Sequence, residues 1–589
     1  MSPADTADQG VDPVTLEVVR NACEAVCEEM NATLVRTAYS PNITERRDCS
    51  CALFDATGQL IAQAETMPVH LGAMPFSVGA ALERFPPETL APGDTIALND
   101  PYHGGAHLPD VTLVSPVFRD PDDESSGTDT DANRTGSFPS GESAPIAFVA
   151  NRAHHADIGG AHAGSVAADS TEIYQEGLRL PPVKLTRGGT PNESILDVIA
   201  ANVRIPGERR GDLRAQQAAN ATGSRRYRDL CDRYGQTNLD DVLSAITAYS
   251  ERRMRAELRD LPDGSATFVD YLDDDGCGTT DVRIEVTVQI DADEVTVDFA
   301  GTAPQTPGPV NAVFAVTASA TYYALRCLSD PDIPPNAGCY RPISIEVPEE
   351  SVVNPSQPAA VVGGNVETSQ RITDVVLGAL AEIVPERAVA GCQGTMNNVT
   401  VGGQDSRDNS PFTFYETQAG GFGGRADADG MDAVHVHMSN TLNTPVEVLE
   451  TAYPLRVRRY ELRPDSCGAG EYRGGLGIRR DLEVCTDRAT VSLLADRHRY
   501  APYGLAGGEA GSPGSAVVFG AGNDRERIPA KCVRVLSKGD VLSVRTPGGG
   551  GYGDPDDRPR DAVERDLRRG ILTAETAQAQ YGYESDEDD

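Results

Sequence analysis

Strand-like and helix-like segments do not alternate regularly along this chain of 589 residues. Asp12 is a predicted N-cap, and a helical spacing of apolar residues runs from it to Tyr39. Short strand-like runs at 51–54 and 59–62 follow, joined by a hairpin turn signal at 55–58. Residues 192–258 are again helical in pattern, and a further helix is expected at 369–382. Residues 267–299 instead read as a strand meander. A doubly wound parallel sheet requires strands and helices in succession. The sequence therefore predicts an α+β fold, a large mixed subunit of several subdomains with antiparallel or mixed sheets and flanking helices.

Changes in composition divide the chain into regions with different expected structure. The regions are a disordered N-terminus (1–10), an N-terminal α+β region (11–260), a β-rich region (261–365) with a helix at 312–328, a mixed α/β region (366–583) and an acidic disordered tail (584–589). Within the second region, residues 119–144 consist mostly of Asp, Ser, Gly, Thr and Pro, so we expect a solvated acidic insertion there.

The charge of the chain limits its partners. With 51 Lys and Arg residues against 89 Asp and Glu residues the net charge is -38, which repels phosphate groups and argues against nucleic-acid and anionic-membrane partners. Lysine occurs only at 184, 531 and 538. An acidic, lysine-poor composition is typical of halophilic cytosolic proteins, where roughly 1 M salt shortens the Debye length to about 3 Å.

Cysteine usage and hydropathy indicate a cytoplasmic, soluble protein. The 12 cysteines form no Cys-x-x-Cys pair, so we expect free thiols in a reducing compartment. The first residues are polar and acidic, unlike a signal peptide. The most apolar long run, 312–328, contains Arg326 and is predicted to be a buried helix and not a membrane span.

Histidines gather in two short stretches. Of nine histidines, five lie within 99–118 or 154–162, namely His103, His107, His154, His155 and His162. His107 and Asp110 are three residues apart, with Pro109 restricting the backbone between them, so both side chains can reach one ion. His154, His155 and Asp157 follow a second strand-like run, which is expected at 146–150. Two strand ends that meet would build a two-histidine, one-carboxylate site suited to manganese, iron or zinc. The alternative is that these histidines are caps and hydrogen-bonded loop anchors.

Other polar motifs are less specific. Glu45-Arg-Arg-Asp48 offers carboxylates and guanidinium groups that can clamp an anion, or it forms a surface ion-pair patch. His70 stands among apolar residues and, taken alone, favours a core histidine over a general base. His435 and His437 alternate along a predicted strand face, either as a ligand pair or as part of a half-buried face. Residues 546–555 lack the Lys and Ser/Thr of a phosphate-binding loop, so we expect a flexible closing loop.

Several motifs together resemble the hydantoinase B/oxoprolinase family. They occur in order from about residue 11 to 583 and are Asn99-Asp-Pro-Tyr with Gly104-Gly105, His107-Leu-Pro-Asp110, His154-His-Ala-Asp-Ile-Gly-Gly160, Glu176-Gly with Pro181-Pro-Val-Lys184, Tyr472-Arg-Gly-Gly-Leu-Gly-Ile-Arg479 and Thr546-Pro-Gly-Gly-Gly-Gly-Tyr-Gly-Asp554-Pro. The acidic stretch 119–144 departs from the family pattern.

The resemblance implies a large subunit in a hetero-oligomer with a hydantoinase A-type partner, an actin-like ATPase. Such a pair opens a cyclic amide, for example N-methylhydantoin or 5-oxoproline, at the expense of ATP. The partner would phosphorylate the carbonyl oxygen of the unstrained lactam and create a good leaving group. This chain would then complete the attack of water with the help of its metal.

The resemblance also implies the site residues. The acetone carboxylase large subunit, a relative, holds manganese through a His-x-x-Asp pair and a later histidine, which would be His107, Asp110 and His155 here. Asp157 and Asp100 would be neighbours of this metal site, and manganese is the favoured ion. Glu45, Asp48 and His70 lie in stretches that also match the family, and we expect acid/base or substrate contacts from them.

Two alternative functions remain open at this point. A large subunit of a ketone carboxylase could use the same metal site, with an additional small subunit and bicarbonate. A non-catalytic assembly subunit would keep the same histidines for structural reasons only.

Overall fold

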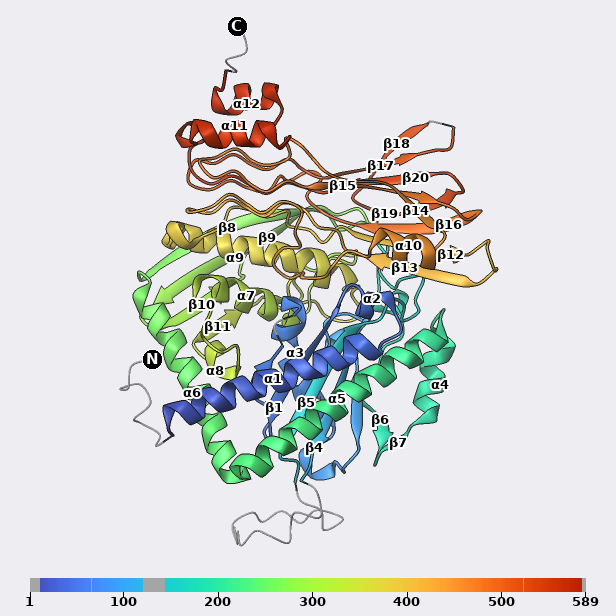
Figure 1. The fold of residues 1–589 in the computed structure, drawn as a ribbon, viewed down its shortest axis with the longest axis vertical. Coiled ribbons are helices and arrows are strands. Elements are labelled where there is room, and N and C mark those ends of the chain that lie inside the picture. Colours follow the sequence, from blue (N-terminus) through green and yellow to red (C-terminus); the bar gives the residue numbers. More distant parts are fainter. Residues whose placement is uncertain (1–10, 65, 120–143, 523, 585–589) are drawn as a thin grey trace. The chain divides into compact units, whose positions relative to one another are not determined.

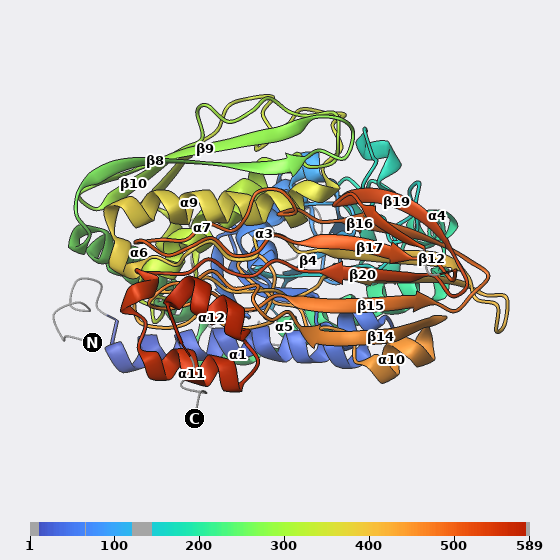
Figure 2. The same ribbon diagram turned by 90° about the horizontal axis from the view of Figure 1, so that it is seen from above.

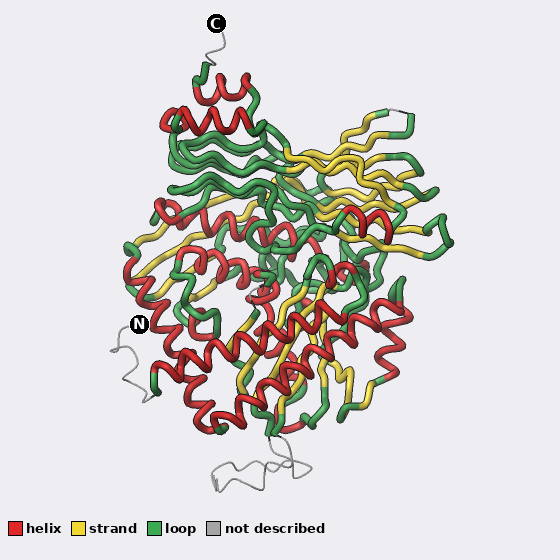
Figure 3. Tube along the Cα trace, viewed as in Figure 1, coloured by secondary structure: helices red, strands yellow, loops and turns green. Residues whose placement is uncertain are grey.

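The computed structural model describes residues 11–64, 66–119, 144–522 and 524–584. The predicted disordered N-terminus, nearly all of the predicted acidic insertion and nearly all of the acidic tail lie outside these residues. The described chain mixes helices with several sheets, which confirms the α+β class (Figures 1 and 3). No helix within the described ranges is long and apolar enough to span a membrane.

The chain divides into two compact units. The described residues of Met1–Ile158, Leu178–Arg259 and Ser329–Ile343 form the first unit, and those of Gly159–Gly177, Asp260–Leu328 and Ser344–Asp589 form the second. Each unit therefore consists of segments that are distant in sequence. The division into separate regions at 260 and 365 stays a prediction.

A single antiparallel sheet organises the first unit. Within the described residues its strand order is β2-β1-β5-β4-β3-β6-β7, and each neighbouring pair is antiparallel. The strands are β1 (Cys49–Asp55), β2 (Leu60–Gln63), β3 (Thr95–Leu98), β4 (Asp110–Val117), β5 (Ala147–His154), β6 (Val183–Arg187) and β7 (Thr190–Pro191).

Helices cover both faces of this sheet. Their bounds are α1 (Pro13–Thr37), α2 (Pro41–Thr44), α3 (Pro68–Arg84), α4 (Glu193–Asn202), α5 (Pro206–Tyr234), α6 (Gln236–Asp260) and α8 (Ala337–Tyr340). The predicted start of α1 is confirmed, since Asp12 caps the helix by accepting a hydrogen bond from the Thr15 backbone N–H at 3.0 Å. Helices α1 and α5 lie side by side (Figures 1 and 2) and share a core with one face of β1 and β5. Helix α3 packs on the opposite face.

Strand β5 shows how side chains are divided between the two faces. Ala147 and Val149 join the core under α1 and α5, whereas Phe148 and Ala150 join the core under α3. The sequence predicted that this strand ends at 150, but it continues to His154. The prediction failed because Asn151 and Arg152 are polar, which favours a loop, although both are fully buried in the strand.

The second unit carries three further sheets in its described residues. Their strand orders are β11-β10-β9-β8, β13-β12-β16-β19 and β14-β15-β20-β17-β18. The predicted meander at 267–299 and the predicted helices at 312–328 and 369–382 are confirmed as β8 to β10, α7 and α9, and α9 lies along β8 and β9 (Figure 2). The strands are β8 (Gly264–Asp274), β9 (Thr280–Asp291), β10 (Glu294–Asp298), β11 (Ile343–Glu346), β12 (Asn398–Gln404), β13 (Pro411–Glu416), β14 (Leu455–Leu462), β15 (Ile478–Val484), β16 (Arg488–Leu494), β17 (Ser515–Phe519), β18 (Arg525–Ile528), β19 (Lys531–Ser537) and β20 (Val541–Arg545). The helices are α7 (Phe314–Leu328), α9 (Ser369–Ile383), α10 (Val446–Ala452), α11 (Arg560–Arg568) and α12 (Ala574–Tyr581).

Glycine-rich segments of the second unit pack closely against one another without forming strands (Figure 3). We call them the glycine bundle, which comprises Gly391, 421–424, 468–475, 504–511 and 548–551. Backbone N–H groups of Gly549, Gly550 and Gly551 donate to carbonyl groups of Gly475, Gly391 and Glu509 at 2.8–2.9 Å. A Cβ atom on Gly549 would lie 2.0 Å from the carbonyl oxygen of Phe422. The predicted flexible closing loop at 546–555 is therefore wrong, since its glycines are buried and permit close backbone contact.

Candidate metal centre

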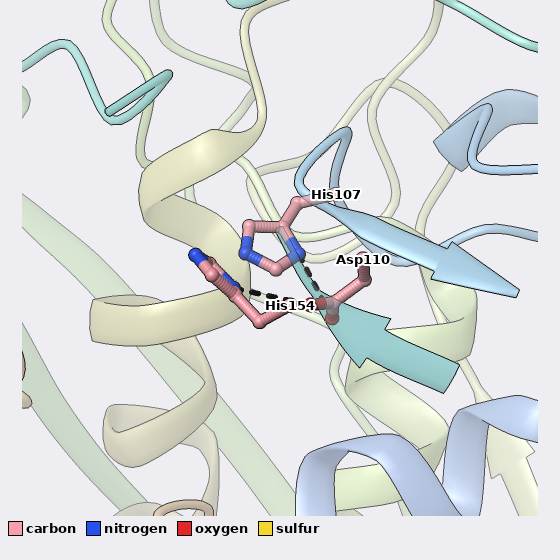
Figure 4. A group of neighbouring side chains, drawn as sticks. All are labelled: His107, Asp110 and His154. Atoms are coloured by element: carbon pink, nitrogen blue, oxygen red, sulfur yellow. Dashed lines mark hydrogen bonds and ion pairs between the residues drawn. The ribbon is translucent and has the colours of Figure 1, made fainter. Parts of the chain in front are cut away.

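Three buried side chains of the first unit converge in an arrangement that can hold a metal ion. Each of His107, Asp110 and His154 offers one ligand atom, and these atoms lie within 4.8 Å of one another. The Nδ1 atom of His107 is 3.0 Å from Oδ2 of Asp110, and the Nδ1 atom of His154 is 3.2 Å from Oδ1 (Figure 4). The carboxylate thus contacts both imidazole rings, whose centroids are 5.0 Å apart.

The sheet and a tight turn position these three residues. Asp110 is the first residue of β4, His154 is the last residue of β5, and the two are direct partners in the strand register. His107 belongs to the turn before β4, where the Asn99 side chain donates to the Leu108 carbonyl at 2.7 Å. The turn requires glycine at position 105, because a Cβ atom there would lie 2.4 Å from the Asn99 carbonyl oxygen, too close for any side chain.

Two more buried residues, Asp48 and His70, adjoin these three. The Nε2 atom of His70, on α3, is 3.2 Å from Oδ2 of Asp110 and 3.8 Å from Oδ1 of Asp48. Asp48 immediately precedes β1, and its backbone carbonyl accepts a hydrogen bond from the His154 N–H at 3.0 Å. We call Asp48, His70, His107, Asp110 and His154 the His-Asp cluster.

The charges in the His-Asp cluster suit a cation. Burial raises the pKa of Asp110, but the neighbouring His107 and His70 outweigh burial and hold that pKa well below its usual range. Burial lowers the pKa of His107, so its ring tends to be neutral and to offer a lone pair. A carboxylate with two imidazoles is a donor set suited to manganese, iron or zinc.

His155, the predicted third ligand, lies outside the His-Asp cluster. Its Nε2 atom is 3.0 Å from Oε1 of Gln216, a residue of α5. Burial, together with the nearby Arg209, lowers the pKa of His155 to about 4. Since β5 continues to His154, alternation places His154 on the α3 face with Asp110 and sends His155 to the α5 face. The structure brings His154 to Asp110 instead.

The remaining predicted neighbours make other contacts. Asp157 pairs with Arg204, whose Nη1 atom is 2.6 Å from Oδ1. Asp100 pairs with His103 and Arg179, at 2.8 Å in both cases. The structure therefore does not bring Asp157 or Asp100 into the His-Asp cluster.

Of the three candidate catalytic residues, Asp48 and His70 belong to the His-Asp cluster, and Glu45 is placed differently. Glu45 follows the short helix α2 and is half-buried. None of the cluster contacts described above involves its side chain.

The two histidines near residue 436 do not share a strand face, so that prediction is wrong. Within the described residues, 433–438 lie outside the strands, and His437 has a left-handed backbone with φ of 50°. His435 Nδ1 is 3.0 Å from Ser439 Oγ, whereas His437 Nε2 is 3.3 Å from Asp374 Oδ1 in the second unit.

The sequence does not predict the proximity of His154 to Asp110 or the convergence of Asp48 and His70. One signal was present for the first: if the strand is extended to 154, Asp110 and His154 can be paired on one face. No local pattern connects residues 48 and 70 with 110, because their proximity arises from the order of β1, β5 and β4 in the sheet.

Comparison with known proteins places the chain among relatives along nearly its whole length. Residues 12–555 match the model of the family described as Hydantoinase B/oxoprolinase. An uncharacterized protein of Methanocaldococcus jannaschii is 40% identical over 97% of this chain and 96% of its own length. A Pseudomonas protein that carries the name of a D-/L-hydantoinase subunit is 35% identical over 99% of this chain and 97% of its own.

Longer relatives and solved structures also match. The 5-oxoprolinase 1 of Arabidopsis thaliana is 36% identical over 94% of this chain, which spans only 42% of that protein. A crystal structure of ATP-dependent caprolactamase from Pseudomonas jessenii superposes with a TM-score of 0.88 at 31% identity, covering 98% of both chains. A nucleotide-free acetone carboxylase structure matches 97% of this chain and 79% of its own with a TM-score of 0.86, and at 18% identity this likeness concerns the fold alone.

Proposed function

Since this chain belongs to the hydantoinase B/oxoprolinase family, we propose that it is the large subunit of an ATP-dependent cyclic amidohydrolase that opens the ring of a hydantoin, 5-oxoproline or a similar lactam. The single observation that carries the proposal is the buried His-Asp cluster. Named relatives support the substrate class, because they include a 5-oxoprolinase, a hydantoinase subunit and an ATP-dependent caprolactamase.

We assign a divalent transition metal to His107, Asp110 and His154, with manganese favoured over iron and zinc by the family resemblance. When bound, such an ion supplies Lewis acidity toward a carbonyl or phosphoryl oxygen and lowers the pKa of water. The anionic Asp110 carboxylate and the neutral ring of His107 are the protonation states that metal binding requires.

We assign proton transfer to His70 and Asp48. The Nε2 atom of His70 lies between the carboxylates of Asp110 and Asp48, and its Nδ1 atom is 3.4 Å from Ser50 Oγ. Contacts on both ring nitrogens fix the orientation of the imidazole, so a proton can be held at Nε2 near the carboxylates of Asp110 and Asp48. For Glu45 a substrate contact stays a prediction.

We assign ATP use to a partner subunit, an actin-like ATPase of the hydantoinase A type. The glycine-rich segment 546–555 does not offer a phosphate-binding loop, because it is packed in the glycine bundle. This chain also spans only 42% of 5-oxoprolinase 1, and we place the ATPase function of such longer proteins in the part that this chain does not match. A hetero-oligomer of the two subunits is the expected active form.

The test is to co-express this chain with the hydantoinase A-type subunit that accompanies it and to assay the purified complex. Ring opening of 5-oxoproline, hydantoins and caprolactam is followed with ATP consumption, and metal content is measured on the same sample. We expect ATP-coupled turnover on at least one of these cyclic amides and about one transition metal ion per chain.

The matched control is the complex carrying His107→Ala, which should assemble but lack both metal and turnover. Absence of turnover on every cyclic amide tested, or full turnover of His107→Ala, would refute the proposal. Full turnover without metal would favour a structural role for these histidines.

A further inference from the structure

One buried arginine differs from all the others in the described chain. Six arginine residues there are less than 2% exposed as whole residues, and five of them have a carboxylate oxygen within 4.0 Å. The five pairs are Arg46–Asp48, Arg209–Asp212, Arg371–Asp270, Arg480–Glu416 and Arg497–Asp374. Among the described residues, Arg152 is the sixth and has no carboxylate within this distance.

The contacts of Arg152 leave one side of its guanidinium group unused. Its Nε atom donates to Thr112 Oγ1 at 2.9 Å, and Nη2 donates to Ser77 Oγ at 2.6 Å. Both acceptors are neutral hydroxyl groups. Within the part of the chain that the structure describes, Nη1 has no hydrogen-bond partner, although it is shielded from solvent.

A buried, unpaired cation is costly for a fold. The free-energy cost of desolvating a charge is offset only by an opposite charge and a complete set of hydrogen bonds. The planar guanidinium group is suited to carboxylate and phosphate oxygens, so an anionic ligand would satisfy both its charge and its free N–H groups.

Arg152 faces the same side of the sheet as the His-Asp cluster. It pairs with Thr112 in the strand register, two residues along from the pair of Asp110 and His154. Its contact with Ser77 on α3 confirms that its side chain points to the α3 face. Residues i and i+2 on one face of a strand are about 7 Å apart, a distance that a small ligand can bridge.

We propose that Arg152 is the oxyanion subsite of the His-Asp cluster, where its guanidinium group receives a carboxylate or phosphoryl oxygen of the reacting ligand. The inference rests on the proposed function, because it assumes that the ligand reacts at that cluster. Two sources of the oxyanion fit this chemistry: the carboxylate of a substrate such as 5-oxoproline, and the phosphoryl group of an activated lactam.

The test measures anion binding directly, by titration calorimetry on the metal-loaded protein with 5-oxoproline and, separately, with inorganic phosphate. The wild type should bind at least one of the two. Arg152→Met, which keeps much of the volume and removes the charge, should weaken that binding about 10-fold or more, and Arg152→Lys should lie between. The probe whose binding is lost identifies the source of the oxyanion.

Controls separate this subsite from a structural charge. Arg480→Met breaks a paired buried arginine and should lower the unfolding temperature, whereas Arg152→Met should lower it less, because no carboxylate is left unpaired. If Arg152→Met does not fold, Arg152→Lys is measured in its place. It should also bind the anion more weakly than the wild type, since lysine keeps the charge but lacks Nη1. Unchanged anion affinity in Arg152→Met, or in Arg152→Lys if Arg152→Met does not fold, would overturn the proposal. So would a wild type that binds neither 5-oxoproline nor inorganic phosphate.

Metal content distinguishes a failure here from a failure of the proposed function. Arg152→Met should retain the metal of the wild type, because Arg152 is not one of the assigned ligands. A wild type without metal would contradict the proposed function. The difference in anion affinity between the wild type and Arg152→Met would still test the Arg152 subsite independently.

Discussion

Asp110 and His154 face each other across β4 and β5, with Oδ1 of the aspartate 3.2 Å from Nδ1 of the histidine. The next residue, His155, lies on the opposite face and contacts Gln216. Two adjacent histidines therefore occupy different environments, one beside the Asp110 carboxylate and one against Gln216 of α5. This makes them a matched pair for mutagenesis.

The first prediction compares His154→Ala with His155→Ala. We expect His154→Ala to lose its metal and its activity, since a ligand is removed. We expect His155→Ala to keep the metal and to lose about 1–3 kcal/mol of unfolding free energy, because Gln216 Oε1 is left without its buried donor. Metal analysis after dialysis and urea unfolding measure the two effects. Equal metal loss in both variants would contradict the assignment.

The second prediction concerns the charge of Asp110, which is fully buried in β4 and not in a flexible loop. Asp110→Asn keeps the shape of the side chain but removes the anion that balances a cation. Chelation should abolish activity of the wild type, and added manganese should restore it. The variant should not recover under the same treatment, and its far-UV circular dichroism should match that of the wild type. Recovery of Asp110→Asn by manganese would show that the carboxylate is dispensable.

The third prediction is a pH dependence of stability that arises from His437. Burial lowers the pKa of His437, but the neighbouring Cys392 and the hydrogen-bonded Asp374 outweigh burial and raise it to about 10. The unfolded value is about 6.5. The stabilisation that protonated His437 contributes is therefore complete below about pH 6.5. It decreases by up to about 1.4 kcal/mol per pH unit as the pH rises toward 10.

Urea unfolding of the wild type and of His437→Gln across this range checks the prediction, because glutamine does not titrate. The difference in unfolding free energy between the two proteins should shrink as the pH rises. The general repulsion from the net charge of -38 acts on both proteins and cancels in the difference. A difference that stays constant with pH would count against a charged His437.

The fourth prediction concerns the glycine bundle. Gly549→Ala places a methyl group against the Phe422 carbonyl and should cost about 3 kcal/mol or more, or prevent folding. The control is Gly264→Ala in the same unit, where the added Cβ atom would lie 3.7 Å from its nearest neighbour, the Cγ2 atom of Ile383. This control should change the unfolding free energy by less than about 1 kcal/mol. Thermal unfolding of both variants is the measurement, and equal midpoints would contradict close packing in the bundle.

Local patterns predicted much of the fold and only part of the candidate site. The Asp12 cap, the hairpin of β1 and β2 and the meander of β8 to β10 follow from residues close in sequence, and all are confirmed. The sequence misplaces the end of β5 because polar residues usually indicate exposure, whereas Asn151 and Arg152 are buried. That error of a few residues concealed the alternation that separates His154 from His155.

Other features depend on contacts between distant residues. His70 reaches Asp110 because α3 packs on the face of the sheet to which Asp110 points, and no spacing in the sequence encodes that contact. The segment 546–555 looks flexible because it has few side chains, yet the same lack of side chains permits dense backbone packing.

The glycine bundle also has a consequence for the folding kinetics of this protein. Its hydrogen bonds join segments far apart in the chain, such as Gly549 to Gly475 and Gly550 to Gly391. Glycine has the largest backbone entropy to lose, and non-local contacts form only after long loops have closed. We therefore expect assembly of the bundle to be among the slowest steps of refolding, with the second unit acquiring its strands before these glycine segments dock.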